Sequence, residues 1–177
     1  CIVGRQAEQS PDTIRRLDDS GHCLVNHSQS HPLPWPMTER HWLDEIDTCD
    51  EVLSRILGRP GIAPTFRPPY GLITPPLRRA LRKRQRLVAG ISYYAFDTYY
   101  TPIGYAKVVR KIVRNATLRE GGAFIFHDYR HRRRPSKRWN LPNSRANRSW
   151  VPAAVDQVIA ELSQAGMTFR RDVCCSP

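Results

Sequence analysis

Two histidines, His27 and His31, stand four residues apart in a segment that follows a short apolar run. If this segment forms one helical turn, the two side chains lie on the same side, about 5–6 Å apart at Cβ. That separation suits two imidazole ligands to one Zn²⁺ ion, each at about 2.0–2.1 Å. Taken alone, the spacing also fits two ordinary surface histidines. It does not match a zincin helix, because Ser28 stands where that motif has its general-base glutamate.

A second candidate segment is the run from Arg67 to Gly71, which contains two prolines and follows a predicted strand. Prolines restrict the backbone angle φ, and a glycine lets the backbone come close to a ligand. The segment is therefore either a tight turn with an exposed arginine or a substrate loop. In the second case its backbone N–H groups would face a developing oxyanion, while Arg67 holds a nearby carboxylate.

A third candidate is His127, which follows a run of four apolar residues and precedes Asp128. This position is the C-terminal end of a predicted strand, where α/β proteins place their sites. A histidine titrates near neutral pH, so His127 could serve as a general acid or be purely structural. The sequence contains no GxSxG segment, which argues against a serine-hydrolase triad built on His127.

Short apolar runs alternate with helical periodicity along the chain, a pattern typical of an α/β domain. Strands are expected at 23–25, 63–66, 87–91, 123–126 and 167–169, so each candidate segment follows a strand. Helices are expected after the N-caps Ser10, Thr38 and Thr74, at Thr101 with Pro102, and near Pro152. These elements would carry the candidate residues at strand ends.

The net charge of +12 comes in large part from the segment 129–148, which has eight Lys or Arg residues and no acid. This composition predicts an exposed loop that the fold does not need. Solvation, or contact with an anionic wall polymer or lipid surface, is favoured over nucleic-acid binding, because no recognised nucleic-acid motif accompanies the loop. No apolar run approaches the ~20 residues of a membrane span.

In their order and setting, these segments resemble the polysaccharide deacetylase family, the NodB-homology domain of carbohydrate esterase family 4. The resemblance rests on Asn-His-Ser-x-x-His-Pro after a strand, then Phe-Arg-Pro-Pro-Tyr-Gly, then a strand that ends in His-Asp. It extends from Ile2 to about Arg171, so one domain is expected over residues 1–171, followed by a tail at 172–177. The resemblance implies an α/β fold, a distorted (β/α) barrel of the NodB-homology type, incomplete at its N-terminus.

The resemblance also implies roles for the first two segments. His27 and His31 match the family's histidine ligands to a divalent metal, with Zn²⁺ the favoured ion. Arg67 matches the arginine that orients the catalytic aspartate. Tyr70 matches the substrate-binding residue whose backbone N–H helps to form the oxyanion hole.

His127 matches the family's general acid. Asp97 matches the first aspartate of the family's Asp-x-x-Asp-Trp segment and is the candidate to orient His127, although the rest of that segment differs here. The family's N-terminal Asp-Asp pair, which supplies the base and the third metal ligand, is expected upstream of Cys1. Asp18 and Asp19 are interpreted instead as solvated charge at a helix end. Without the Asp-Asp pair, residues 1–177 are expected to show little or no deacetylase activity.

The resulting hypothesis is metal-dependent hydrolysis of N-acetyl groups from an amino-sugar polymer, such as peptidoglycan, chitin oligomers or an exopolysaccharide. The protein would be a polysaccharide N-deacetylase, a hydrolase acting on carbon–nitrogen bonds other than peptide bonds, in the cell envelope or secreted. A non-catalytic glycan-binding module of the same fold is the alternative. Candidate sugar-stacking side chains are Tyr93, Tyr94, Tyr99, Tyr100 and Trp35, whereas Trp42 is expected in the core.

Overall fold

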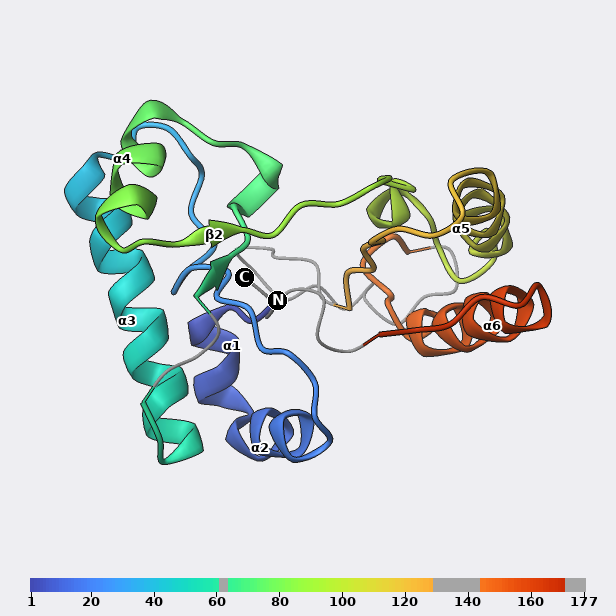
Figure 1. The fold of residues 1–177 in the computed structure, drawn as a ribbon, viewed down its shortest axis with the longest axis horizontal. Coiled ribbons are helices and arrows are strands. Elements are labelled where there is room, and N and C mark those ends of the chain that lie inside the picture. The colour runs from blue at the N-terminus through green and yellow to red at the C-terminus, as the bar shows by residue number, and fades with distance from the viewer. Residues whose placement is uncertain (61–63, 129–143, 171–177) are drawn as a thin grey trace. The chain divides into compact units, whose positions relative to one another are not determined.

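The computed structural model describes residues 1–60, 64–128 and 144–170 (Figure 1). The chain divides into two compact units, of which the first comprises Cys1–Gly90 with Arg170 and the second Ile91–Phe169. The C-terminal boundary expected at residue 171 lies outside the described residues, and the single domain over 1–171 stays a prediction. In the described ranges, no helix combines the length and apolarity needed to cross a membrane.

The first unit holds four of the described α-helices and a short parallel sheet. The helices are α1 (Gly4–Gln9), α2 (Pro11–Asp19), α3 (Glu39–Leu57) and α4 (Pro75–Lys83). The strands are β1 (Thr65–Phe66) and β2 (Leu87–Val88), and the 3-10 turn η1 (Pro69–Gly71) follows β1. Helix α3 packs against α1, α2 and α4, as Figure 1 shows. It is therefore the central helix of this unit.

The extended segments of the first unit pair in parallel and in chain order. Ile2 bridges Asn26, Asn26 bridges the end of β1, and β1 pairs with β2. The backbone N–H groups of His27, Arg67 and Ala89 each donate to a carbonyl of the preceding segment, at 2.8–2.9 Å. Since parallel segments end at the same edge of a sheet, the residues that follow them are brought together there. That edge carries the histidine and arginine segments.

Helix α3 forms because its apolar residues recur at helical spacing and its ends are capped. The hydroxyl of Thr38 accepts a hydrogen bond from the backbone N–H of His41 at 3.2 Å, and Gly58 ends the helix with φ 65°. The predicted cap is therefore confirmed. The buried face of α3 consists of Trp42, Ile46, Cys49, Val52, Leu53 and Ile56, so Trp42 is a core residue as expected.

The second unit is built on the helices α5 (Ala106–Leu118) and α6 (Val151–Gln164), which pack together (Figure 1). The 3-10 turn η2 (Asp97–Tyr99) precedes them, and Tyr93 forms a parallel bridge with Phe124. The two helices bury a cluster of apolar side chains between them: Ala95, Val108, Val109, Ile112, Ala116, Trp150, Val151, Ala154, Val158 and Leu162.

Several element predictions are wrong in detail. Thr101 does not open a helix: it begins a turn in which Gly104 N–H donates to its carbonyl at 3.0 Å, and α5 starts at Ala106. Ser10 makes no side-chain cap bond to α2, and α1 was not expected. No bridge falls within the strand predicted at 23–25, since the isolated bridges there are made by Asn26. The strand predicted at 123–126 is reduced to a bridge at Phe124, and 167–169 is not a strand. Such short extended segments gain order from the elements that cover them rather than from β-propensity.

Gly4 lets α1 approach α3 closely. A Cβ atom at this position would lie 1.8 Å from Gln29 Oε1 and 3.3 Å from Cys49 Cα. The Gln29 side chain could move aside, but the Cα of Cys49 belongs to the backbone of α3. Any side chain at residue 4 would therefore push the two helices apart.

We expect Gly4→Ala to lower the free energy of unfolding of the first unit by about 1–3 kcal/mol, as overpacking does elsewhere. Gly90→Ala is the matched control, because a Cβ at Gly90 meets nothing within 4 Å. Urea denaturation followed by circular dichroism would measure both. Equal unfolding midpoints for the two variants would show that α1 can shift at no cost.

Candidate active site

The structure brings the rings of His27 and His31 into contact. Their centroids are 4.9 Å apart with an interplanar angle of 78°. The segment that carries them is not the helical turn predicted from the spacing. It is a bend in which Ser28 and His31 both have left-handed backbone, with φ 67° and 52°. Such angles are uncommon for residues other than glycine, so neighbouring groups must hold the bend.

The buried side chain of Asn26 is one of those groups. Its amide N–H group donates to the Ile46 carbonyl at 2.9 Å and to the Asp50 carboxylate at 2.7 Å, both on α3. Its amide oxygen accepts from the N–H of Ser28 at 2.8 Å. The Ser28 hydroxyl then accepts from the backbone N–H of His31 at 3.0 Å. Asn26 and Ser28 belong to the histidine motif of the sequence, but the motif by itself predicts no positioning role for them.

The His27 ring is oriented by a backbone carbonyl. Its Nδ1 lies 2.7 Å from the oxygen of Arg67, which can only accept, so Nδ1 carries the proton and Nε2 keeps a lone pair. Burial lowers the pKa of His27 to about 3. The bond to Arg67 acts against this shift, and the charge of His31 adds to it. The ring is therefore neutral near pH 7, as a metal ligand must be.

The two histidines fit a divalent metal as nitrogen donors. One ring has its tautomer set by a second partner, which is the usual arrangement of ligating histidines, and both lie at the same sheet edge. Among the described residues, no group of three His, Cys, Asp or Glu side chains is placed to hold a metal. The pair would therefore supply two ligands, and its metal role stays a prediction.

The Arg67–Gly71 loop lies against the histidine pair. In addition to its carbonyl contact with His27, Arg67 donates from its guanidinium to the Ala89 carbonyl at 2.8 Å. The Tyr70 ring contacts the His31 ring edge-on, with centroids 4.8 Å apart. The Tyr70 backbone is left-handed, with φ 58°, and its side chain is about half exposed. The four site residues predicted in the first unit are thus neighbours, and their individual roles stay predictions.

In the second unit, Asp97 holds His127 at two points. Its Oδ1 lies 2.8 Å from Nδ1 of the ring, and its Oδ2 accepts from the backbone N–H of His127 at 2.8 Å. Asp97 is fully buried, whereas the side chain of His127 is 36% exposed. With Nδ1 occupied, Nε2 is the ring nitrogen left for proton transfer. Asp97 therefore orients His127 even though the rest of its sequence segment departs from the family pattern.

Arg148 completes the arrangement of Asp97 and His127. The sequence did not predict this role for Arg148. It belongs to the segment predicted to be an exposed loop, yet it is 8% exposed and donates to Asp97 Oδ2 at 2.5 Å. That prediction is wrong for Arg148, because a buried carboxylate requires a cation. Arg145 is exposed as expected, and residues 129–143 lie outside the described ranges. Composition alone could not separate the buried Arg148 from the exposed Arg145.

The Asp97 carboxylate is held in its charged form. Burial acts to raise its pKa, but the hydrogen bonds and charge of His127, with the charge of Arg148, outweigh burial and lower the pKa below its usual range. A lowered carboxyl pKa means that the folded state favours the ionised group. Asp97 is therefore an anion at neutral pH.

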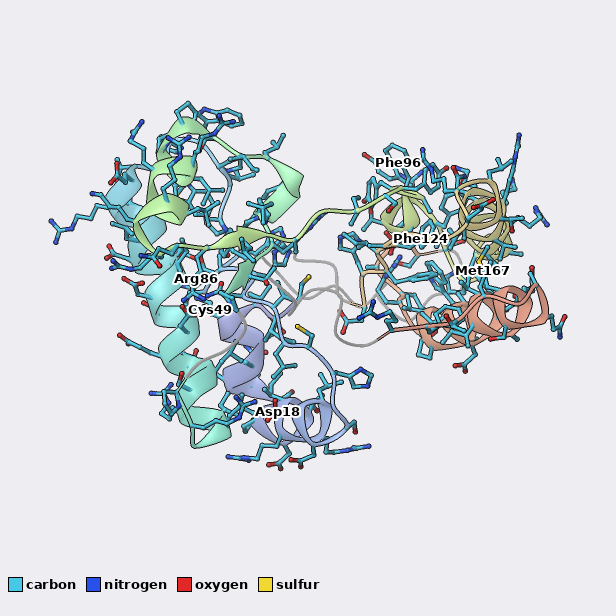
Figure 2. All side chains as sticks on the ribbon, viewed as in Figure 1. Asp18, Cys49, Arg86, Phe96, Phe124 and Met167 are labelled. Carbon is cyan, nitrogen blue, oxygen red and sulfur yellow. The ribbon has the colours of Figure 1, made fainter. Side chains whose placement is uncertain are left out.

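The structure leaves several aromatic rings exposed. The Tyr94 ring is centred 6.0 Å from the His127 ring and 4.7 Å from Phe96, which Figure 2 labels. Phe96 and Tyr99 are both more than half exposed, and Trp35 in the first unit is 66% exposed. Their exposure is compatible with sugar stacking, which stays a prediction.

The acidic pair at the end of α2 is surface charge, as predicted. Asp18, labelled in Figure 2, forms an ion pair with Arg59 at 2.6 Å, and Asp19 is exposed. Neither residue belongs to the histidine segment.

The family comparison agrees with the resemblance seen in the sequence. Residues 1–87, which include His27, His31, Arg67 and Tyr70, match the family model described as polysaccharide deacetylase. Residues 1–87 belong to the polysaccharide deacetylase family. Among curated proteins, the chain is similar to a peptidoglycan-N-acetylglucosamine deacetylase of Bacillus cereus, with 37% identity over 73 residues. That match covers 41% of the chain and 26% of the relative, so the chain aligns with about a quarter of that protein.

Solved structures extend the likeness in fold to both units of the chain. A family 4 carbohydrate esterase from Streptomyces lividans, in complex with acetate, matches 99% of the chain and 80% of its own at 20% identity, with a TM-score of 0.70. A Clostridium thermocellum acetyl xylan esterase in complex with a cobalt ion matches 95% and 71% at 22% identity, with a TM-score of 0.72. A family 4 pseudoenzyme from Bacillus anthracis matches 94% and 50% at 16% identity, with a TM-score of 0.69. The predicted fold class, the NodB-type (β/α) barrel, is confirmed.

We expect Asp97→Asn to destabilise the second unit by about 3 kcal/mol at pH 7, because it leaves Arg148 buried without its anion. The folded pKa of Asp97 is depressed, so its stabilising contribution is present above the unfolded value and is lost as the pH falls through the folded one. The difference between wild type and variant should therefore narrow from pH 7 to pH 3. Urea unfolding at several pH values would measure it, with exposed Asp156→Asn as the control. A pH-independent difference would contradict the depressed pKa.

Proposed function

We propose that the protein removes N-acetyl groups from an amino-sugar polymer by metal-assisted hydrolysis. The observation that carries the proposal is the pair of contacting imidazoles, with His27 held as the Nδ1–H tautomer by the Arg67 carbonyl. This arrangement offers nitrogen lone pairs beside a backbone loop, which suits a metal next to an oxyanion site. The curated relative named as a peptidoglycan-N-acetylglucosamine deacetylase supports an N-acetylated glycan as the substrate class.

His27 and His31 would hold the divalent metal, for which their nitrogen donors favour Zn²⁺. When bound, such an ion would supply Lewis-acid chemistry: it would polarise the acetamide carbonyl and make water more acidic. Tyr70 would present its backbone N–H to the developing oxyanion, from a backbone whose left-handed conformation is set by the loop. Arg67 would orient the carboxylate that serves as the base, which the family resemblance assigns to the N-terminal Asp-Asp pair.

His127 would act as the general acid. Breakdown of a tetrahedral amide intermediate requires a proton on the nitrogen, since an amide anion is a poor leaving group. Asp97 binds Nδ1 of His127, so the proton is transferred from Nε2. Asp97 would also stabilise the ring while it is protonated, as the aspartate of a hydrolase triad does.

A glycan-binding module without catalysis is the competing function. The pseudoenzyme of Bacillus anthracis has the same fold, so the fold alone does not separate the two functions. Metal binding and acetate release separate them.

The metal assignment predicts that His27→Ala and His31→Ala each weaken Zn²⁺ binding by about tenfold or more, because each removes one ligand. Isothermal titration calorimetry of the full-length protein would measure the affinity. His41→Ala is the matched control, since His41 is exposed on α3 and should bind no metal with them. Equal affinities for all three variants would refute the assignment.

The acid assignment predicts that His127→Ala slows acetate release from an N-acetylglucosamine oligomer by about 10²–10⁴-fold while Zn²⁺ affinity is retained. Asp128→Ala, which changes the exposed neighbouring residue, should leave the rate within a few-fold. Release would be measured with the full-length protein and an enzymatic acetate assay. Glycan binding with no acetate release by the metal-loaded wild type would favour the binding module.

A further inference from the structure

Arg148 makes three side-chain hydrogen bonds to the Asp97–His127 pair, and no role above accounts for them. Its Nη2 donates to Asp97 Oδ2 at 2.5 Å, and its Nη1 donates to the backbone carbonyl of Asp97 at 2.9 Å. Its Nε donates to the backbone carbonyl of His127 at 2.7 Å. Three nitrogens of one guanidinium are therefore bound to two residues that lie 30 positions apart in the sequence.

We propose that Arg148 is the positioning residue of the proton donor: it holds the Asp97 carboxylate and the backbone of His127 in one rigid unit. The inference deepens the proposed function and rests on it for the role of His127. Arg148 reaches neither substrate nor the transferred proton in this assignment. It acts through Asp97 and through the main chain.

The chemistry of arginine suits this task. Its planar guanidinium presents donors in a fixed fork, whereas the ammonium group of lysine is a point charge. Because Oδ2 of Asp97 is bound by Arg148 and by the N–H of His127, the carboxylate cannot rotate away. Its Oδ1 therefore stays on Nδ1 of the ring. The guanidinium also lies over the Trp150 ring, 4.5 Å from its centroid, which holds it from the other side.

The charge of Arg148 should also affect how readily His127 gives up its proton. A buried carboxylate with no other partner would hold an imidazolium tightly. Arg148 offsets that negative charge, so the ring faces an ion pair rather than a lone anion. Among the described residues, two other titratable neighbours of the His127 ring are the exposed Asp128 and Tyr94, whose ring is centred 6.0 Å away. Arg148 thus differs from a purely structural ion pair, which would leave His127 unaffected.

The test is an NMR titration of the His127 ring in the full-length protein, combined with the acetate assay. For Arg148→Met we expect the midpoint of the ring titration to rise by about one pH unit, since a nearby like charge is removed. Acetate release should fall about tenfold through kcat, with KM little changed. Arg148→Lys should keep the midpoint near that of wild type but recover only part of the rate, because the fork is lost.

Arg114→Met is the matched control. It removes the same charge from an exposed side chain on α5, in the same unit. Neither the midpoint nor the rate should change in this variant. An unchanged His127 midpoint in folded Arg148→Met would overturn the proposal. If that variant does not fold, a wild-type rate in Arg148→Lys overturns it instead.

The two readouts separate this inference from the proposed function. The ring titration needs no turnover, so it tests the effect of Arg148 on His127 even if the wild type releases no acetate. If the wild type releases no acetate but the His127 titration is shifted in Arg148→Met, the deacetylase function is refuted. The effect of Arg148 on the His127 ring is then still supported.

Discussion

The site in the first unit depends on one buried amide, that of Asn26. Asn26 belongs to the parallel ladder through its backbone. Its side chain forms hydrogen bonds with α3 and with the bend that carries the histidines. A buried polar group is stable only when its donors and acceptors are satisfied, so the sheet, the helix and the bend must form together. The left-handed backbone of Ser28 and His31 is a consequence of that requirement. Helix α3 thereby sets where the imidazoles lie, although it contributes neither of them.

The second unit satisfies its buried polar groups with charged side chains. Asp97, His127 and Arg148 come from three separate segments and meet in a buried network of opposite charges and backbone carbonyls. Ion pairs of this kind recover the cost of desolvation only when further hydrogen bonds support them, and each of the three guanidinium nitrogens of Arg148 donates one. The first network also includes a charged group, since the Asn26 amide donates to the Asp50 carboxylate.

Much of this arrangement could be predicted from the sequence, because the signals were local. Thr38, Thr74 and the apolar spacing of α3 predicted where helices start and which faces are buried. Motif order predicted the family and the residues at the strand ends. Two features could not be found this way. The bend at His27 is set by contacts with α3, which helical spacing cannot reveal, and Arg148 is buried by residues 21 and 51 positions away. Tertiary contacts override local composition at both places.

The contact between His27 and the carbonyl of residue 67 has a consequence for how this chain can vary. The group that selects the ring tautomer belongs to the main chain, so every amino acid at position 67 supplies the same acceptor. Tautomer selection and the chemistry of the Arg67 side chain are therefore genetically separable. Substitutions at this position can alter or abolish the side chain's function and leave the imidazole oriented as before. Only a change that displaces the strand itself, such as an insertion within 65–67, would affect both.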